Sequence, residues 1–402
     1  MNKPELLAPA GSFASLQAAI RYGADAIYVG GSLLQLRAKS AAFSLEELAK
    51  AASYAHQYGK KLYVTVNALA KCDEIDLLKI YANDLHACGV DTAIVSDLGV
   101  LVTMHEACPA LELHVSTQAS CQNHAAALTY YRLGAKRIVL AREMTIEEIR
   151  KLSKQIPEDL ELEAFVHGAM CMAVSGRCIL SSALLGRSGN RGECAQPCRW
   201  QYHLVEETRP NHFLPIEQEG QTTAILSSRD LNCIELLDEL QDAGVSSLKI
   251  EGRMKTEYST AVTVNAYRHA IDHTAPTELL QHELETISHR PYTTGFYCGE
   301  LPEDHANRGT YLQTYRFCGV ILSVQDNTAL IEQRNRFEVG DSLELVSPFA
   351  LSEKITIDWI RNEEGNPVSV ANKVRQKIWI PVSSSTQPGD FLRIAAKPEK
   401  KD

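Results

Sequence analysis

Five of the eleven cysteines in this 402-residue chain lie within a stretch of 63 residues. They are Cys171, Cys178, Cys194, Cys198 and Cys233. In a cytosolic protein such a group more often binds a metal or takes part in catalysis than forms disulfides. Four thiolates can hold an iron–sulfur cluster, and a structural zinc accepts the same ligands. The stretch lacks the short C-x-x-C pairs of a zinc ribbon, so its spacing favours an iron–sulfur cluster over zinc or uncoordinated thiols.

Eight short apolar runs, separated by helix-like segments, lie on either side of the cysteines. They span residues 6–8, 26–29, 61–66, 92–95, 113–116, 137–140, 162–166 and 247–250. Most are continuously apolar and rich in β-branched residues, as expected for a parallel sheet that is covered on both faces. Eight strand–helix units favour a closed barrel, and the first run is not followed by the G-x-G-x-x-G of a dinucleotide-binding sheet. We therefore expect an α/β fold, a (β/α)8 TIM-like barrel, over residues 1–290.

Three further parts depart from the barrel pattern. Residues 168–244 form an insertion between the seventh and eighth strands, and this insertion carries all five clustered cysteines. Residues 291–309 contain glycines and prolines and are typical of a linker. Residues 310–402 show short alternating strands with turns, among them 317–322 and 355–359. This pattern predicts a separate small antiparallel β-barrel at the C-terminal end.

Composition limits the class of protein. Hydrophobic residues make up 45% and charged residues 22%, as in ordinary globular proteins, which excludes a disordered chain. The net charge of −10 argues against a protein that coats nucleic acid by bulk electrostatics, although a local basic funnel can still bind RNA. No apolar run approaches the roughly 18 residues that a membrane span needs. The first residues show no signal peptide, so we expect a cytoplasmic protein without a membrane partner.

Motifs for hydrolysis are weak. A zinc protease needs His-Glu-x-x-His, and the nearest matches, at residues 105–108 and 282–285, lack the second histidine. There is no G-x-S-x-G nucleophile motif. His167 and Cys171 could form a cysteine-protease pair, but that leaves the other clustered cysteines unexplained. A peptidase and a non-catalytic RNA-binding factor built around a metal remain as alternatives.

The stretch from Glu163 to Ser181, EAFVHGAMCMAVSGRCILS, resembles the signature of peptidase family U32, the collagenase-like proteins. Residues 7–11, 116–118, 192–200 and 248–255 also fit, and with the tail β-barrel the likeness spans nearly the whole chain. Within the family, the chain is most similar to the branch that hydroxylates the wobble uridine of tRNA. This resemblance implies an RNA-modifying enzyme that forms 5-hydroxyuridine, with a 4Fe–4S cluster as cofactor and prephenate as the hydroxyl source.

The resemblance also implies which residues bind the metal. Cys171 and Cys178 match the two signature cysteines, and Cys194 matches the cysteine of the glycine-rich loop. Cys233 matches the fourth, although relatives place that cysteine directly after an Asp-Leu pair and Asn232 intervenes here. Cys198 is therefore the substitute for Cys233. The implied partners are tRNA, a small dicarboxylate and either a second copy of the chain or a related family member.

Polar side chains at or just past the predicted strand ends supply the remaining candidates. We expect catalytic roles for His167, Glu163, Arg142, Lys249 and Glu251. Among these, His167 could act as a general acid or base. A dicarboxylate needs two cationic anchors, which Arg253 and Arg142 could supply. The residues expected to bind substrate are Arg253, Lys255, Arg37, Gln118 and Asn67.

Overall fold

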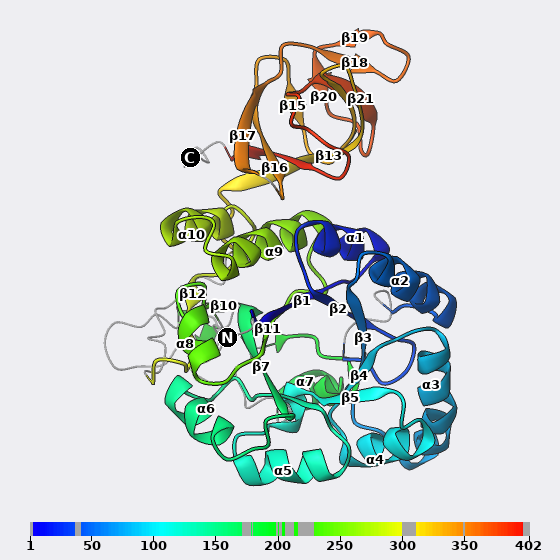
Figure 1. The fold of residues 1–402 in the computed structure, drawn as a ribbon. Helices are drawn as coiled ribbons and strands as arrows, with labels where there is room; N and C mark the ends of the chain where they lie inside the picture. Colours follow the sequence, from blue (N-terminus) through cyan, green and yellow to red (C-terminus); the bar gives the residue numbers. More distant parts are fainter. Residues whose placement is uncertain are drawn as a thin grey trace.

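The structure is a computed structural model, and eight parallel strands form its centre. It describes residues 3–36, 42–170, 178, 180–197, 200, 203–205, 213–215, 229–299, 311–348 and 350–396. The eight strands are β1 (Glu5–Pro9), β2 (Ala26–Gly30), β3 (Lys61–Val66), β4 (Thr92–Val95), β5 (Glu112–Val115), β6 (Arg137–Val139), β7 (Glu161–Ala169) and β11 (Ser247–Ile250). Because β11 pairs with both β1 and β7, the sheet closes on itself (Figure 1). The expected TIM-like barrel is confirmed.

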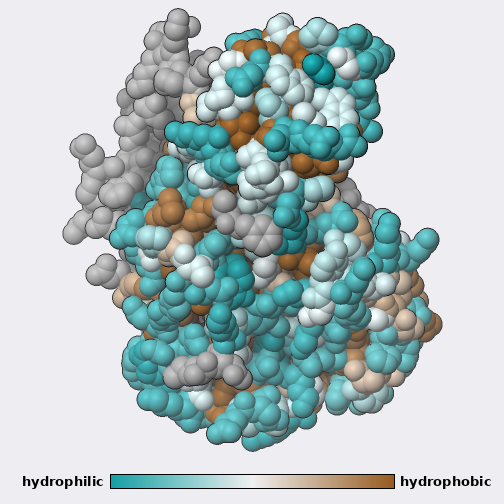
Figure 2. All heavy atoms as spheres, turned by 45° about the horizontal axis from the view of Figure 1, so that its top comes forward, coloured by the Kyte–Doolittle hydropathy of each residue, from teal (hydrophilic) through white to brown (hydrophobic). Residues whose placement is uncertain are grey.

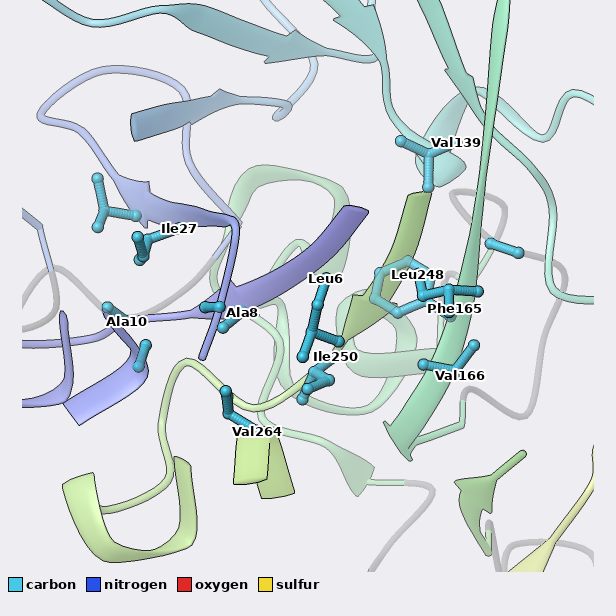
Figure 3. Close-up of a cluster of buried hydrophobic side chains, with 14 of the residues drawn as sticks. Leu6, Ala8, Ala10, Ile27, Val139, Phe165, Val166, Leu248, Ile250 and Val264 are labelled. Carbon is cyan, nitrogen blue, oxygen red and sulfur yellow. The ribbon is translucent and has the colours of Figure 1, made fainter. Parts of the chain in front are cut away.

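Helices surround the barrel and bury its outer face. They are α1 (Phe13–Arg21), α2 (Leu45–Gln57), α3 (Ile75–Ala87), α4 (Leu98–Ala107), α5 (His124–Arg132), α6 (Ile146–Ser153), α8 (Leu237–Asp242) and α9 (Glu257–Ile271), followed by α10 (Thr277–Glu285). Ser44 and Thr145 begin α2 and α6 with full capping boxes, which satisfy the first free N–H groups of each helix. Figure 3 shows part of the core, where Val264 of α9 lies beside Ile250 of β11. No described helix is long and apolar enough to cross a membrane.

The barrel interior differs from this apolar shell. Side chains alternate along a strand, so Leu6 and Ala8 pack against the helices while Leu7 points inward. Leu7 forms a small inner cluster with Ala26, Tyr28, Tyr63 and Ile94. Other inward positions carry charged side chains, which form the network described below.

The strand that precedes the predicted insertion is longer than expected. Strand β7 does not end at residue 166 but continues to Ala169, because β10 (Asp230–Asn232) pairs with its end in antiparallel fashion. β10 also pairs with β12 (Tyr292–Thr293), which extends the sheet beyond the barrel. The described parts between them include α7 (Leu180–Leu185) and the backbone hairpin of β8 (His203–Val205) and β9 (Phe213–Pro215).

The C-terminal part is an eight-stranded antiparallel sheet that curls on itself above the barrel (Figure 1). Its strands are β13 (Tyr315–Gln325), β14 (Thr328–Gln333), β16 (Ser342–Ser347), β17 (Ala350–Thr356), β18 (Ile360–Asn362), β19 (Pro367–Val368), β21 (Lys377–Pro381) and β22 (Phe391–Ala395), with β15 (Phe337–Glu338) and β20 (Val370–Ala371) as a separate pair. The expected antiparallel domain is confirmed, but the predicted strand over residues 355–359 was wrong in its extent, since β17 ends at Thr356. The boundaries at residues 290 and 310 stay predictions, because residues 300–310 lie outside the described ranges.

The C-terminal sheet packs against helices α9 and α10 of the barrel. Arg393 of β22 is buried and forms a two-pronged ion pair with Glu283 of α10, with distances of 2.8 and 2.7 Å. Tyr258 of α9 stacks on Phe317 of β13, with ring centroids 5.0 Å apart. Figure 2 shows the two parts in contact, with hydrophilic residues over much of this face. The two domains therefore share a packed interface with a buried charge pair at its centre.

Candidate active site

The mouth of the barrel, at the carboxyl ends of its strands, holds three cations and two aromatic rings. Lys249 Nζ lies 4.6 Å from the ring centroid of Tyr28 and 5.5 Å from that of Phe165. The Arg253 guanidinium carbon lies 6.0 Å from the Tyr28 ring, and that of Arg142 lies 5.0 Å from the Phe165 ring. We call these five residues the cation–aromatic cluster. Their alternation holds three positive charges close together at the place where TIM barrels carry out chemistry.

Both arginines of this cluster are fixed in place. Arg253 Nη1 donates to Thr65 Oγ1 at 2.8 Å and to Gln35 Oε1 at 3.4 Å. Arg142 Nη1 donates to the carbonyl oxygen of Ala169 at 2.9 Å. Each arginine is more than nine-tenths buried. A guanidinium in such a setting is pre-organised for a carboxylate or phosphate, because little side-chain entropy is left to lose.

Glu163 lies beneath the cluster, inside the barrel. Its side chain is fully buried, and Lys249 Nζ donates to Glu163 Oε1 at 2.6 Å. Arg137 Nη1 and Ser247 Oγ donate to the other carboxylate oxygen at 3.1 and 3.3 Å. Burial opposes ionisation of Glu163, but the charges of Lys249 and Arg137 outweigh it and hold the pKa at about 2. Glu163 is therefore a charged group that positions Lys249, and it has no exposed surface with which to meet a substrate.

The charged network continues to the opposite end of the barrel. Arg137 also pairs with Glu5 and with Glu161, the latter at 2.6 Å, and Tyr63 donates to Glu5 at 2.8 Å. Barrel interiors are usually filled by branched apolar side chains, so a row of ion pairs is a distinct feature of this one. Sequence analysis did not single out Arg137 or Glu5. The signal that could have found them is a charged residue at an inward position of an otherwise apolar strand.

His167 does not face this cluster. The register between β7 and β11 shifts after Lys249, and His167 then lies against α9, with Nδ1 3.4 Å from the Tyr267 hydroxyl. Burial, together with the nearby positive charge of Lys255, lowers the pKa of His167 to about 3. The ring is therefore neutral near pH 7. The role of His167 as an acid or base stays a prediction that would have to act outside the barrel mouth.

A second pocket surrounds His167 on the outer side of the rim. It is lined by His167, Asp230, Glu251, Lys255, Ser259 and His289, among others. Lys255 Nζ donates to the carbonyl oxygen of Ser288 at 2.8 Å, which directs it away from the mouth. The expected catalytic and substrate-binding residues thus divide into two groups, with Arg142, Lys249 and Arg253 in the mouth and Glu251 and Lys255 outside it.

Three expected substrate-binding residues remain. Asn67 Nδ2 donates to Ser116 Oγ at 3.3 Å, and the backbone N–H of Gln118 donates to the same oxygen at 3.3 Å. Asn67 follows β3 and Gln118 follows β5, so Ser116 links them at the rim. Arg37 lies outside the described residues.

Part of the insertion is tied across the loops that follow β2 and β3. Arg191 forms a two-pronged ion pair with Glu74, at 2.9 and 2.7 Å, and also donates to the carbonyl oxygen of Leu69 at 2.6 Å. The hydrogen bond from Arg191 holds the pKa of Glu74 at about 2. Gly192 has a φ of +84°, and a Cβ there would collide with the carbonyl oxygen of Gln35. Gln35 is the residue that contacts Arg253, so this strap, residues 188–193, reaches the edge of the mouth.

Three of the five clustered cysteines lie among the described residues. Cys194 directly follows the strap, is exposed, and accepts the N–H of Gln196 on its sulfur at 3.3 Å. Cys178 is half-buried, and Cys233 is fully buried with its N–H donating to the Val166 carbonyl at 2.9 Å. Cys171 and Cys198 lie outside the described residues. Among the described residues, no group of three or more His, Cys, Asp or Glu is arranged to hold a metal.

The pairing of β10 with β7 constrains any shared site. Asn232 lies opposite His167, whereas the N–H of Met170 bonds to the carbonyl oxygen of Arg229. Cys233 therefore follows β10 at one end of this strand pair, and Met170 lies at the other end. Thiolates are the usual ligands of an iron–sulfur cluster, and N–H groups that donate to their sulfurs tune its potential; the Cys194 sulfur accepts one such N–H, from Gln196.

Most of the chain is similar to known proteins of one family. Residues 11–307 match the model of peptidase family U32, and residues 313–393 match its C-terminal domain. The chain is 36% identical over 403 residues to tRNA hydroxylation protein P1 of Bacillus subtilis, covering 98% of this chain and 95% of that protein. It is 39% identical over 272 residues to the 23S rRNA 5-hydroxycytidine C2501 synthase of Escherichia coli. This match covers 67% of this chain and 40% of that protein. It is 32% identical over 414 residues to a protein named collagenase from Porphyromonas gingivalis, covering 98% of each.

Proposed function

Because the chain belongs to peptidase family U32 and is similar over nearly its full length to a protein named for tRNA hydroxylation, we propose that it is an RNA-modifying enzyme. Its proposed reaction is hydroxylation of the wobble uridine of tRNA to 5-hydroxyuridine. The observation that carries the proposal is the cation–aromatic cluster, in which three buried cations converge at the mouth of a TIM-like barrel. Such a mouth suits an anionic co-substrate better than a neutral peptide bond.

The proposed co-substrate is prephenate, a dicarboxylate. Arg253 contacts the ring of Tyr28, Arg142 contacts the ring of Phe165, and Lys249 lies near both rings. Each carboxylate of a dicarboxylate could therefore meet one arginine, with Lys249 between them. The aromatic faces would pack against the six-membered ring of the ligand. Lys249 is held by Glu163 and can hold or donate a proton to the bound acid.

The proposed cofactor is a 4Fe–4S cluster bound by Cys171, Cys178, Cys194 and Cys233. When bound, it supplies one-electron redox chemistry beside the mouth. Support comes from the strap, in which Gly192, two residues before Cys194, lies against Gln35, the residue that contacts Arg253. Cys198 is the substitute fourth ligand, and zinc is the alternative metal.

A complementation experiment tests the substrate. In a strain that lacks the gene, the wild-type chain should restore 5-hydroxyuridine at the wobble position, measured by mass spectrometry of tRNA nucleosides. Arg253→Met and Lys249→Met should each reduce it by about tenfold or more, as expected for losing a charged hydrogen bond. Arg150→Met, which removes a partly exposed arginine on α6, is the matched control and should restore wild-type levels. Unchanged wobble uridines with the wild-type chain would remove the substrate assignment.

Metal analysis tests the cofactor separately. Protein purified without oxygen should be brown and contain iron and sulfide, and Cys171→Ala should abolish both. Comparing Cys233→Ser with Cys198→Ser identifies the fourth ligand, since only the ligand's loss should lower the iron content. Colourless protein that contains zinc would contradict the cluster. Proteolysis of gelatin by clean protein, lost in Cys171→Ala, would favour the peptidase alternative.

A further inference from the structure

Tyr311 is an exposed aromatic residue whose ring has two cations close to it. Its side chain is 47% exposed, and Lys255 Nζ and the Arg290 guanidinium carbon lie 5.0 and 5.2 Å from its ring centroid. The neighbouring residue Leu312 exchanges two backbone hydrogen bonds with His289, at 3.1 and 2.8 Å. The backbone at Tyr311 is therefore fixed while its ring stays open to solvent. Exposure alone would not set this ring apart, but the two cations near an open aromatic ring combine the two features that bind single-stranded nucleic acid.

This ring lies outside the mouth of the barrel, but it contacts a loop that also carries a residue of the mouth. Lys255 is two residues after Arg253, and the chain turns tightly there, with the N–H of Lys255 donating to the Gly252 carbonyl at 2.9 Å. Two residues span at most about 7 Å. Arg253 points into the mouth toward Thr65, whereas Lys255 points outward toward Tyr311. The same short loop thus joins the cation–aromatic cluster to the Tyr311 ring.

We propose that Tyr311, with Lys255 and Arg290, is the platform on which a nucleotide flanking the target base stacks. Enzymes that modify a base take it out of the stack and contact its neighbours on either side. Base stacking on an aromatic side chain tolerates any sequence. The partly exposed Lys255 would meet the phosphate of the same nucleotide, whereas Arg290 is buried and adds positive charge beside the ring. The inference rests on the proposed RNA substrate and adds the place where the strand is held. An acidic peptide could meet the cations, but it would leave the face of the ring unused.

Binding of a single-stranded oligouridylate, followed by fluorescence anisotropy at fixed salt, tests this platform. Tyr311→Ala should weaken binding roughly 5- to 150-fold, the range for loss of one stacked base. Tyr311→Phe keeps the ring and should bind within about twofold of wild type. Lys255→Met should lower the slope of log affinity against log salt by about 1. Tyr58→Ala is the matched control, because Tyr58 is 54% exposed but ends α2 at the opposite face of the barrel.

The outcomes separate this inference from the proposed function. Equal affinity of wild type and Tyr311→Ala would overturn the platform, even if the wild-type chain restores wobble hydroxylation. Absence of any RNA binding, or tighter binding to a polyglutamate peptide than to RNA, would overturn it as well. Loss of RNA binding in Tyr311→Ala alone would support the platform even if tRNA hydroxylation is not restored by the wild-type chain.

Discussion

Replacing Glu163 by glutamine tests whether this buried carboxylate holds the barrel mouth together. The pKa of about 2 in the folded chain, against 4.5 for an ordinary glutamate, corresponds to about 3 kcal/mol of stabilisation at neutral pH. Removing one partner of a buried ion pair independently suggests about 3–5 kcal/mol, because the other charge stays buried without compensation. Glu163→Gln should therefore destabilise the barrel by about 3 kcal/mol. It should also lower the pKa of Lys249, which burial already depresses.

Glu161 provides a matched control on the same strand. It pairs with the same Arg137 at 2.6 Å, but its side chain is 46% exposed. Ion pairs with an exposed partner contribute about 1 kcal/mol or less. Glu161→Gln should thus have a small effect, although it removes the same chemical group from the same arginine.

Amide hydrogen exchange of peptides from β7 measures this difference locally, without assuming that both domains unfold together. The stabilisation by Glu163 should be complete above about pH 4.5 and disappear as the pH falls toward 2, since the unfolded carboxylate takes up its proton first. Glu163→Gln should lack this pH dependence. In Glu163→Gln/Lys249→Met the loss should be smaller than the sum of the single losses, because no lysine is left stranded. Equal protection in Glu163→Gln and Glu161→Gln would refute the reasoning.

Three further expectations concern other parts of the chain. Glu74→Gln should release the strap and speed tryptic cleavage at Arg191 several-fold, with a change in global stability of about 1 kcal/mol or less because the ion pair is partly exposed. Arg393→Met should strand Glu283 at the domain interface and cost about 3–5 kcal/mol, seen as faster hydrogen exchange in β22. The His167 ring should show no NMR titration between pH 5.5 and 8, and stability should fall as the pH drops below about 6.5, because only the unfolded histidine takes up a proton there.

The barrel could be predicted because its signals are local. Each of the eight predicted runs overlaps one strand of the closed sheet, since a buried parallel strand is apolar on both faces and needs no distant partner to be recognised. The end of β7 was missed for the opposite reason. Residues 167–169 remain in a strand because β10 pairs with them from more than sixty positions away in the sequence, and no local pattern reveals that contact.

The site could be predicted only in part. Arg142, Lys249 and Arg253 were expected at the rim from their places after strands, and the structure brings them together. His167 turns to the other side because the register shifts at Lys249, and a simple alternation of side chains does not anticipate such a shift. The ion pair of Arg191 with Glu74 joins residues 117 positions apart, so sequence spacing gave no hint of the strap.

The cation–aromatic cluster also explains how an acidic chain could bind anions. The net charge of −10 belongs to residues 1–309, since residues 310–402 carry equal numbers of acidic and basic residues, and salt screens exposed charges beyond about 8 Å. Lys249, Arg142 and Arg253 are buried, and at an effective dielectric constant of about 20 their pull on a nearby anion is about four times that in water. A ligand at the mouth therefore responds to these three charges rather than to the distant acidic residues. Because two cations, Lys255 and Arg290, lie near the Tyr311 ring among the described residues, binding of single-stranded RNA should depend weakly on salt, with a slope no steeper than about −1.4 rather than the steep slope of a protein that coats nucleic acid.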